Sequence, residues 1–145
     1  MKPVKVVLDT NIYIAAARNP DSTLYKIVAD SAAQYLAEYY TSPEILAELQ
    51  EKLEGKFGFT RDEVVRWISQ LEQSVKVIRP KQKIEIIERD PDDNKILECA
   101  LEVKAELIIS ADKDLLSLKE FRGTKIIHPI ALIYVFPQLN KPIDN

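Results

Sequence analysis

A short apolar run near the N-terminus, stopped by a polar triplet, constrains the fold more than any other feature of this sequence. Residues 4–8 read Val-Lys-Val-Val-Leu, and Asp9-Thr10-Asn11 follows directly. A nearly continuous apolar run of this length is typical of a parallel strand that is covered on both faces. We therefore expect a central strand at residues 4–8 whose carboxyl end reaches the surface at Asp9.

Further apolar runs alternate with segments of helical periodicity along the rest of the chain. The residues at 35–41 fit a strand or a helix end, and clearer strands are expected at 75–78, 107–110 and 125–127. Helices are expected over 12–18, from about 24, over 42–55, from 60 to about 71, over 90–103 and from about 129. Alternation of this kind predicts an α/β protein with a mainly parallel sheet. Residues 1–145 suit one domain, with a tail from about 137 that we expect to be flexible.

Two helix starts carry local capping signals. Ser42 precedes Pro43, which combines a hydroxyl acceptor at the N-cap with proline in the first turn. Thr60 and Glu63 have the spacing of a capping box. The two helices that follow are expected to form a hairpin.

Composition excludes several classes of protein. Hydrophobic residues make up 46% of the chain and charged residues 30%, which excludes a mainly disordered chain. The formal net charge of -3 argues against binding of nucleic acid by bulk electrostatics, so such a role would depend on a local site. A single cysteine, Cys99, excludes an intramolecular disulfide. No signal peptide or membrane span is visible, and we expect a cytoplasmic protein without membrane association.

Acidic residues gather at the expected carboxyl ends of the strands. Asp9 follows the first strand, and Asp112 and Asp114 follow the strand that ends at Ser110. In a parallel sheet these ends meet at one edge, which is where open α/β sheets bind ligands. Asp93 stands in the first turn of its helix, where backbone N–H groups favour an anion. We expect these side chains to share one cleft.

Glu48 is the best further candidate, because it borders the apolar stripe of the helix over 42–55. Gathered carboxylates repel one another and raise one another's pKa values unless a cation compensates, so the cluster argues for a bound metal. Oxygen ligands favour Mg²⁺ or Mn²⁺, and we expect one or two ions. The chemistry suited to such a site is phosphodiester hydrolysis by metal-activated water. His128, the only histidine, is not expected to be catalytic.

Each of these features also has a purely structural interpretation. Asp9 and Asp93 could serve as helix caps and Glu48 could be a solvated helix residue, so only the set is informative. The densest basic stretch could guide a phosphate backbone or could be a solvated loop. It consists of Lys76, Arg79, Lys81 and Lys83.

Four segments in order resemble the PIN-domain family, and within it the toxin–antitoxin PIN proteins related to VapC-type toxins. They are Val-Val-Leu-Asp-Thr-Asn at 6–11, Ser-Pro-Glu-Ile-Leu-Ala-Glu-Leu at 42–49, Asp-Pro-Asp-Asp-Asn-Lys-Ile-Leu-Glu-Cys-Ala at 90–100 and Ile-Ile-Ser-Ala-Asp-Lys-Asp-Leu-Leu at 108–116. The resemblance spans residue 4 to about 133.

The resemblance implies a three-layer α/β/α sandwich with a five-stranded, mainly parallel sheet in the order 3-2-1-4-5, and metal-dependent ribonuclease activity. The four family acids fall on Asp9, Glu48, Asp93 and Asp112. Asp93 is chosen over Asp90 and Asp92 for its spacing to Ala100. Asp114 matches a further acid, and small polar residues that orient the acids or the bound water fall on Thr10, Asn11 and Ser110.

The leading hypothesis is a Mg²⁺ or Mn²⁺ dependent endoribonuclease, the toxin of a toxin–antitoxin pair. The resemblance further implies an RNA substrate, an antitoxin protein as partner and a homodimer or higher homo-oligomer. Two alternatives stay open. One is a non-catalytic nucleic-acid-binding or regulatory module that keeps the acids for metal-assisted folding. The other is a phosphatase of small phosphate esters that uses the same metal cluster.

Overall fold

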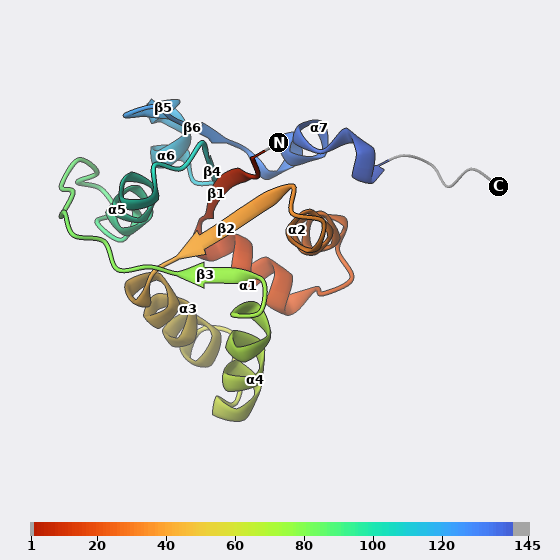
Figure 1. Cartoon of the computed structure of the whole chain (residues 1–145). Coiled ribbons are helices and arrows are strands. Elements are labelled where there is room, and N and C mark those ends of the chain that lie inside the picture. The colour runs from red at the N-terminus through yellow and green to blue at the C-terminus, as the bar shows by residue number, and fades with distance from the viewer. Residues whose placement is uncertain (1, 141–145) are drawn as a thin grey trace.

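A twisted sheet in the strand order β3-β2-β1-β4-β6-β5 forms the centre of the molecule (Figure 1). The structure is a computed structural model that describes residues 2–140. Neighbouring strands run parallel except for β5, which pairs antiparallel with β6. The strands are β1 (Val4–Leu8), β2 (Ala37–Thr41), β3 (Val75–Val77), β4 (Leu107–Ile109), β5 (Glu120–Phe121) and β6 (Thr124–Ile127).

The five parallel strands have the expected order, so the predicted fold is confirmed. The prediction of five strands missed β5, a two-residue strand that is too short to show an alternating pattern. It returns to β6 through Arg122 and Gly123, which both have positive φ. Two such residues in a row match the twist of a tight hairpin. The alternative of a helix end at 35–41 is resolved as well, since only Tyr35 and Leu36 lie outside β2.

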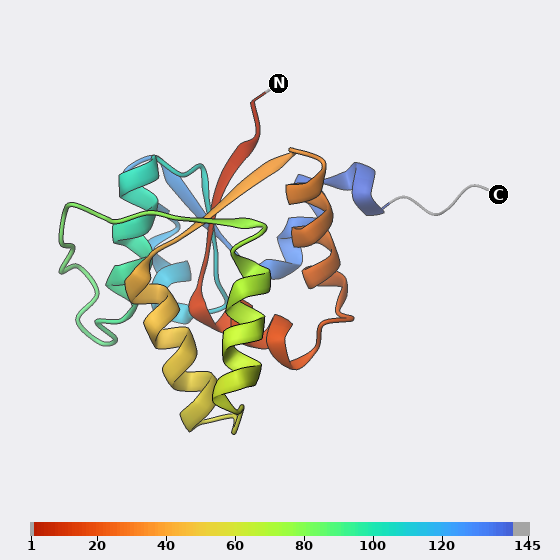
Figure 2. The ribbon, with the colours of Figure 1, turned by 60° about the horizontal axis from the view of Figure 1, so that its bottom comes forward.

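Helices cover both faces of the sheet. The α-helices are α1 (Thr10–Arg18), α2 (Thr23–Ala33), α3 (Pro43–Gly55), α4 (Arg61–Leu71), α5 (Asp93–Val103), α6 (Lys113–Leu118) and α7 (Leu132–Val135). Figures 1 and 2 show α5 on one side of the sheet and α2 with α7 on the other. The helices α3 and α4 lie side by side at the end where β1 stops, and α3 also packs on α1 and α5. This arrangement brings the start of α5 and the middle of α3 toward the carboxyl ends of β1 and β4.

The two capping signals are confirmed. The Ser42 hydroxyl accepts a hydrogen bond from the backbone N–H of Ile45 at 3.3 Å. Thr60 and Glu63 form a reciprocal capping box, with bonds of 3.0 and 3.2 Å. The α3–α4 hairpin also forms as expected.

The chain end differs from a regular helix beginning at Pro129. Two short 3-10 helices, η1 (Pro129–Ala131) and η2 (Pro137–Asn140), flank the single turn of α7. The expected flexible tail from about 137 therefore begins within η2, and residues 141–145 lie outside the described residues. In the described part of the chain, no helix is both long enough and apolar enough to cross a bilayer.

The segment of residues 78–92, here called the strap, joins β3 to α5 without helix or strand. Side chains spaced four residues apart on α5 hold it. Glu102 accepts a hydrogen bond from the backbone N–H of Lys81 at 2.8 Å, and Glu98 accepts one from Ile84 at 2.9 Å. Asn94 accepts from Ile87 at 2.9 Å and donates back to its carbonyl at 2.9 Å. The strap therefore runs antiparallel to α5 and returns to its first turn.

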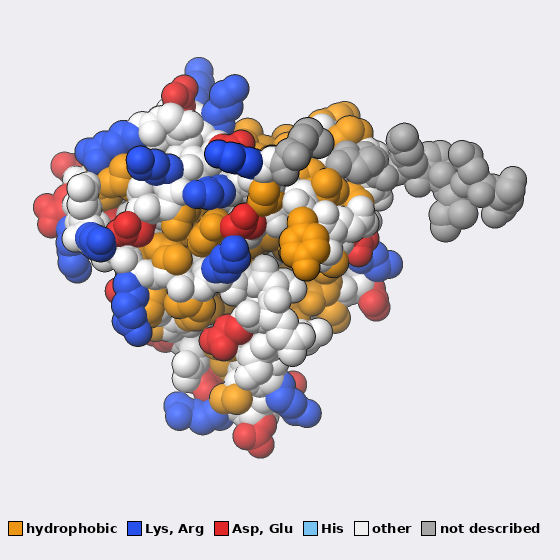
Figure 3. Space-filling view, in the orientation of Figure 1, with side chains coloured by type: hydrophobic (Ala, Val, Ile, Leu, Met, Phe, Trp, Pro, Cys, Tyr) orange, Lys and Arg blue, Asp and Glu red, His pale blue; other side chains and the backbone are white. Residues whose placement is uncertain are grey.

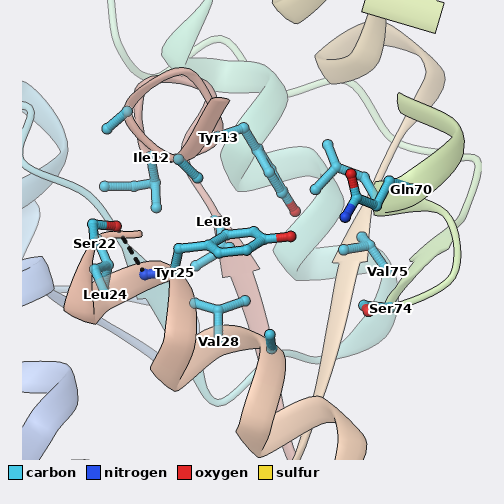
Figure 4. A pocket seen from close by; sticks show the side chains of 14 residues that line it. Leu8, Ile12, Tyr13, Ser22, Leu24, Tyr25, Val28, Gln70, Ser74 and Val75 are labelled. Carbon is cyan, nitrogen blue, oxygen red and sulfur yellow. Dashed lines mark hydrogen bonds between the residues drawn. The ribbon is translucent and has the colours of Figure 1, made fainter. Parts of the chain in front are cut away.

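A small apolar cavity of about 40 Å³ lies between α1, α2 and α4 (Figure 4). Tyr13 and Tyr25 line it, and the buried hydroxyl of Tyr13 has no hydrogen-bond partner among the described residues. Burial raises the pKa of Tyr13. The volume suits a few water molecules, whereas pockets for small organic ligands have about 300 Å³ or more. A ligand as large as a nucleotide therefore does not fit this cavity.

Candidate functional site

Three aspartates converge where the strap enters α5. Asp90, Asp93 and Asp112 each offer one carboxylate oxygen, and the three oxygens lie within 4.8 Å of one another. Asp90 is exposed, Asp112 is half-buried and Asp93 is buried at 6% exposure. One oxygen of Asp93, Oδ2, is buried without a hydrogen-bond partner in residues 2–140. An unsatisfied buried carboxylate oxygen is costly unless a cation or a proton compensates it.

Ser110 connects Asp9 to this cluster. Its hydroxyl donates to Oδ2 of Asp9 at 2.7 Å and accepts from the backbone N–H of Asp112 at 2.9 Å. Asp9 itself continues the ladder of β1, because its N–H donates to the carbonyl of Ile109 at 3.0 Å. Parallel pairing of β1 with β4 thus sets both acids at one edge of the sheet.

Glu48 approaches from α3. Its Oε2 accepts a hydrogen bond from the hydroxyl of Thr10 at 3.2 Å, and its Oε1 lies 2.9 Å from Nζ of Lys52. Thr10 is the first residue of α1, directly after Asp9. The contact between α1 and α3 therefore brings Glu48 beside the acid that ends β1.

Burial and mutual repulsion disturb the titration of these acids. Burial, the adjacent carboxylate of Asp112 and the charges of Asp9 and Asp90 raise the pKa of Asp93 to about 8. Burial is also the main cause that raises the pKa of Asp9, against the opposing hydrogen bond from Ser110. Both shifts mean that the charged forms of Asp9 and Asp93 are unfavourable in the metal-free protein. The oxygen-only ligand set and the unsatisfied Asp93 oxygen fit a hard divalent cation.

An open cleft of about 570 Å³ adjoins the cluster. Asn11 and Asp114, both proposed from the sequence, line it together with Asp112. Asp112 also caps α6, because its Oδ1 accepts from the N–H groups of Asp114 at 2.9 Å and Leu115 at 3.1 Å. The carboxylate of Asp114 is not one of the three close oxygens.

The structure does not bring the basic stretch to the cleft. The N–H of Lys81 is bonded to Glu102 near the far end of α5, so Arg79, Lys81 and Lys83 lie along that helix away from Asp93. Lys76 instead pairs with Glu38 at 2.7 Å.

The sequence-based choice of Asp93 over its neighbours left out Asp90, which the structure brings into the same cluster. The N–H of Asp93 donates to the carbonyl of Asp90 at 3.0 Å, so a tight turn puts both on the same side. Asp92 is exposed and pairs with Lys95 at 2.9 Å. In the sequence, the spacing of three residues between Asp90 and Asp93 was the feature that could have indicated that both lie on the same side of a turn. No sequence signal marked Arg89, which lines the cleft beside Asp90.

Replacing Ser110 by Ala should lower any metal-dependent activity of the site about ten- to a hundredfold, the usual cost of removing a residue that orients metal ligands. The change deletes the bridge between Asp9 and Asp112 and leaves both carboxylates in place. Titration with Mn²⁺ by calorimetry, and turnover where an activity is found, would measure it. Ser117→Ala on α6 is a suitable control, because within residues 2–140 its exposed hydroxyl bonds only to the carbonyl of Asp114. If Ser110→Ala and Ser117→Ala have equal Mn²⁺ affinity and equal turnover, Ser110 does not orient the metal ligands.

Sequence comparison identifies relatives of the chain. A family model described as PIN domain matches residues 5–114. The uncharacterized protein MJ1680 of Methanocaldococcus jannaschii is 36% identical over 122 residues, which cover 81% of this chain and 76% of that protein.

Two solved structures share the fold. A chain in the crystal structure of VapBC2 from Rickettsia felis, bound to a DNA fragment from their promoter, matches with a TM-score of 0.61 and 16% identity, covering 86% of this chain and 98% of that chain. The toxin VapC20 of Mycobacterium tuberculosis, described as sarcin-ricin loop cleaving, matches with a TM-score of 0.56 and 15% identity, covering 83% and 98%. At this level of identity the likeness concerns the fold.

Proposed function

This chain belongs to the PIN-domain family, and from that premise we propose that it is a metal-dependent endoribonuclease that hydrolyses RNA phosphodiester bonds. The observation that carries the proposal is the convergence of Asp90, Asp93 and Asp112, with a buried Asp93 oxygen that lacks a partner. The acids of this site, proposed as catalytic and metal-binding residues, are Asp9, Glu48, Asp90, Asp93, Asp112 and Asp114.

The metal ion and the side chains of such a site have different roles. Mg²⁺ or Mn²⁺, one or two ions, would supply an activated water and neutralise charge on the phosphate. Ser110 and Thr10 hold Asp9 and Glu48 in fixed orientations through their hydroxyl hydrogen bonds. The part of the cleft lining that the structure describes contains no serine, cysteine or histidine, so attack by water rather than by a side chain fits the site. Asn11 is proposed to orient the water or the substrate from the cleft wall.

The proposal extends to the partners of the protein. The similar chain from Rickettsia felis is part of a VapBC assembly, and VapC20 is a toxin that cleaves the sarcin-ricin loop. These likenesses support a role for this chain as the toxin of a toxin–antitoxin pair. They also support an antitoxin protein as its partner, and we retain a homodimer or higher homo-oligomer as the proposed assembly.

Cleavage of a panel of structured and single-stranded RNAs with Mn²⁺, Mg²⁺ or EDTA tests the proposed function. We expect cutting with either metal and none with EDTA. Wild type and Asp93→Asn should be compared side by side, and a matched DNA panel tests the choice of RNA. If no substrate is cut with any ion while metal still raises the melting temperature, the nuclease proposal is wrong and the chain is a binding module. Turnover of phosphate monoesters alone would indicate a phosphatase.

Arg79, Lys81 and Lys83 are proposed to contact RNA outside the cleft. Figure 3 shows Lys and Arg side chains mixed with acids along the edge formed by the strap and α5. Replacing all three by Gln should weaken RNA binding and reduce the slope of log Kd against log salt by about 2, at about 0.7 per phosphate contact on a single strand. Fluorescence anisotropy at several salt concentrations measures this slope. An unchanged slope would make the stretch a solvated loop.

A further inference from the structure

Two cationic side chains line the acidic cleft without forming an ion pair among the described residues. Arg89 and Lys113 lie on the cleft wall with Asp90, Asp112 and Asp114. Among the described residues 2–140, neither cation has a carboxylate oxygen within 4.0 Å. A cleft that presents carboxylates and free cations together is suited to a ligand that combines a divalent cation with an anion. A phosphodiester held by a metal ion is such a ligand.

The backbone of Arg89 is held on both sides. Two residues before it, Ile87 exchanges hydrogen bonds with the side chain of Asn94 at 2.9 Å in both directions. One residue after it, the carbonyl of Asp90 accepts the N–H of Asp93 at 3.0 Å. Asn94 is itself buried at 6% exposure and also accepts from the N–H of Ile86 at 3.2 Å. The short stretch that carries Arg89 is therefore fixed to the first turn of α5, next to the cluster.

The other cations near the site are less suited to this task. Lys52 is paired with Glu48 at 2.9 Å. The basic stretch is bonded to α5 at Glu102, and nine residues of helix from Asp93 correspond to about 14 Å at 1.5 Å per residue. That distance spans neighbouring nucleotides rather than the phosphate at the cluster. Between the two free cations of the cleft, a guanidinium offers a planar fork that matches two phosphate oxygens, whereas an ammonium acts as a point charge.

We propose that Arg89 binds the phosphate of the RNA that occupies the acidic cleft, and that Asn94 is the residue that positions Arg89. The cleft volume of about 570 Å³ accommodates a nucleotide, since pockets for ligands of that size have about 300 to 1,000 Å³. This inference rests on the proposed ribonuclease function. It adds the residue that recognises the phosphate, which neither the acids nor the basic stretch supplies.

The test compares Arg89→Gln and Arg89→Lys with the matched control Arg66→Gln, an exposed arginine on α4. Three quantities are measured: kcat and KM for a single-stranded RNA with Mn²⁺, the Kd of the same RNA with Ca²⁺, and Mn²⁺ binding by calorimetry without RNA. Arg89→Gln should lower kcat/KM about ten- to a hundredfold and weaken RNA binding, because a charge-assisted hydrogen bond is lost. Arg89→Lys should recover only part of the loss, and Mn²⁺ binding should stay unchanged in both variants.

The outcomes separate this inference from the proposed function. If wild type cleaves RNA and Arg89→Gln stays within twofold of Arg66→Gln, the role of Arg89 is wrong and the nuclease stands. If Arg89→Lys has the kcat/KM of wild type, a bidentate contact of the guanidinium with the phosphate is ruled out. A wild type that binds no RNA under any metal ion would overturn the phosphate site together with the proposed function.

Asn94→Ala tests the positioning step. In the Asn94→Ala protein, the further change Arg89→Gln should lower kcat/KM by less than a third of the factor that it causes in wild type. The reason is that the guanidinium is no longer held at the phosphate. Melting curves confirm that the variant is folded, and Mn²⁺ binding shows whether Asp93 stays in place. Two results would overturn the role of Asn94. One is that the free-energy costs of Asn94→Ala and Arg89→Gln, calculated from kcat/KM, simply add in the double variant. The other is that Asn94→Asp has wild-type kcat/KM and leaves the effect of Arg89→Gln unchanged.

Discussion

Replacing Asp9 by Asn is expected to reduce metal-dependent RNA cleavage by at least about a thousandfold, because metal stabilisation of the transition state is worth several kcal/mol and each 1.36 kcal/mol is tenfold in rate. Asp9 is 4% exposed at the end of the central strand, and Ser110 holds its Oδ2 at 2.7 Å. An amide keeps this shape and most of the hydrogen bonding, but it removes the charge that a cation needs.

The same substitution should not destabilise the metal-free protein. Burial raises the pKa of Asp9, so its charged form is unfavourable in the fold, and a neutral amide avoids that cost. We expect a melting temperature equal to or above that of wild type without metal, together with a smaller rise on adding Mn²⁺. Asp30→Asn, an exposed change on α2, is the control. Full cleavage by Asp9→Asn would refute the proposed site, and cleavage lost through unfolding would show as a lowered melting temperature.

The metal-free protein should lose stability as the pH rises from about 5 to about 8. Asp93 has a pKa of about 8 in the folded protein against an ordinary value of 3.8, so the folded state binds its proton more tightly than the unfolded state does. The stabilisation from this proton is complete below the unfolded pKa and is lost as the pH passes through the folded one. Asp9 contributes in the same direction. Melting temperatures measured in EDTA between about pH 5 and about pH 8 give the slope of stability against pH.

Metal ions should reverse this trend. A divalent cation binds the deprotonated carboxylates and competes with the proton, so its stabilising effect should grow as the pH rises. In Asp93→Asn the metal-free slope should flatten, because the main titrating group is gone. A melting temperature that rises with pH in EDTA, or an unchanged slope in Asp93→Asn, would contradict the proposed charge balance of the cluster.

The predictable parts of the structure depended on local or strongly patterned signals. The run at residues 4–8 and the polar residue after it specified the central strand and the edge to which Asp9 belongs. Ser42 and Thr60 marked their helix starts because capping is decided within four residues of sequence. The parallel order of the strands followed from their alternation with helices and from the resemblance to the PIN family.

The parts that were missed depend on tertiary contacts. The strap is held along α5 because Asn94, Glu98 and Glu102 accept hydrogen bonds from its N–H groups, and nothing in the strap's own residues shows that such acceptors exist on a later helix. Asp90 joins the cluster through the turn that brings it back to Asp93, and only its spacing of three residues from Asp93 indicated that turn in the sequence. No sequence motif marked Arg89, because its proposed role depends on its position in the wall of the cleft.

The central position of β1 has a consequence for the synthesis of the protein. Among the strands of the sheet β1 is made before the others, yet its two neighbours are β2 and β4, and Asp112 follows Asp9 about 100 residues later, or about 5 to 20 seconds of translation at 5–20 residues per second. During that time the nascent chain holds Asp9 without the residues that complete the acidic cluster. Until β4 and α6 are made, the nascent chain cannot form the metal site of the proposed ribonuclease, and the proposed antitoxin has the same interval in which to be present.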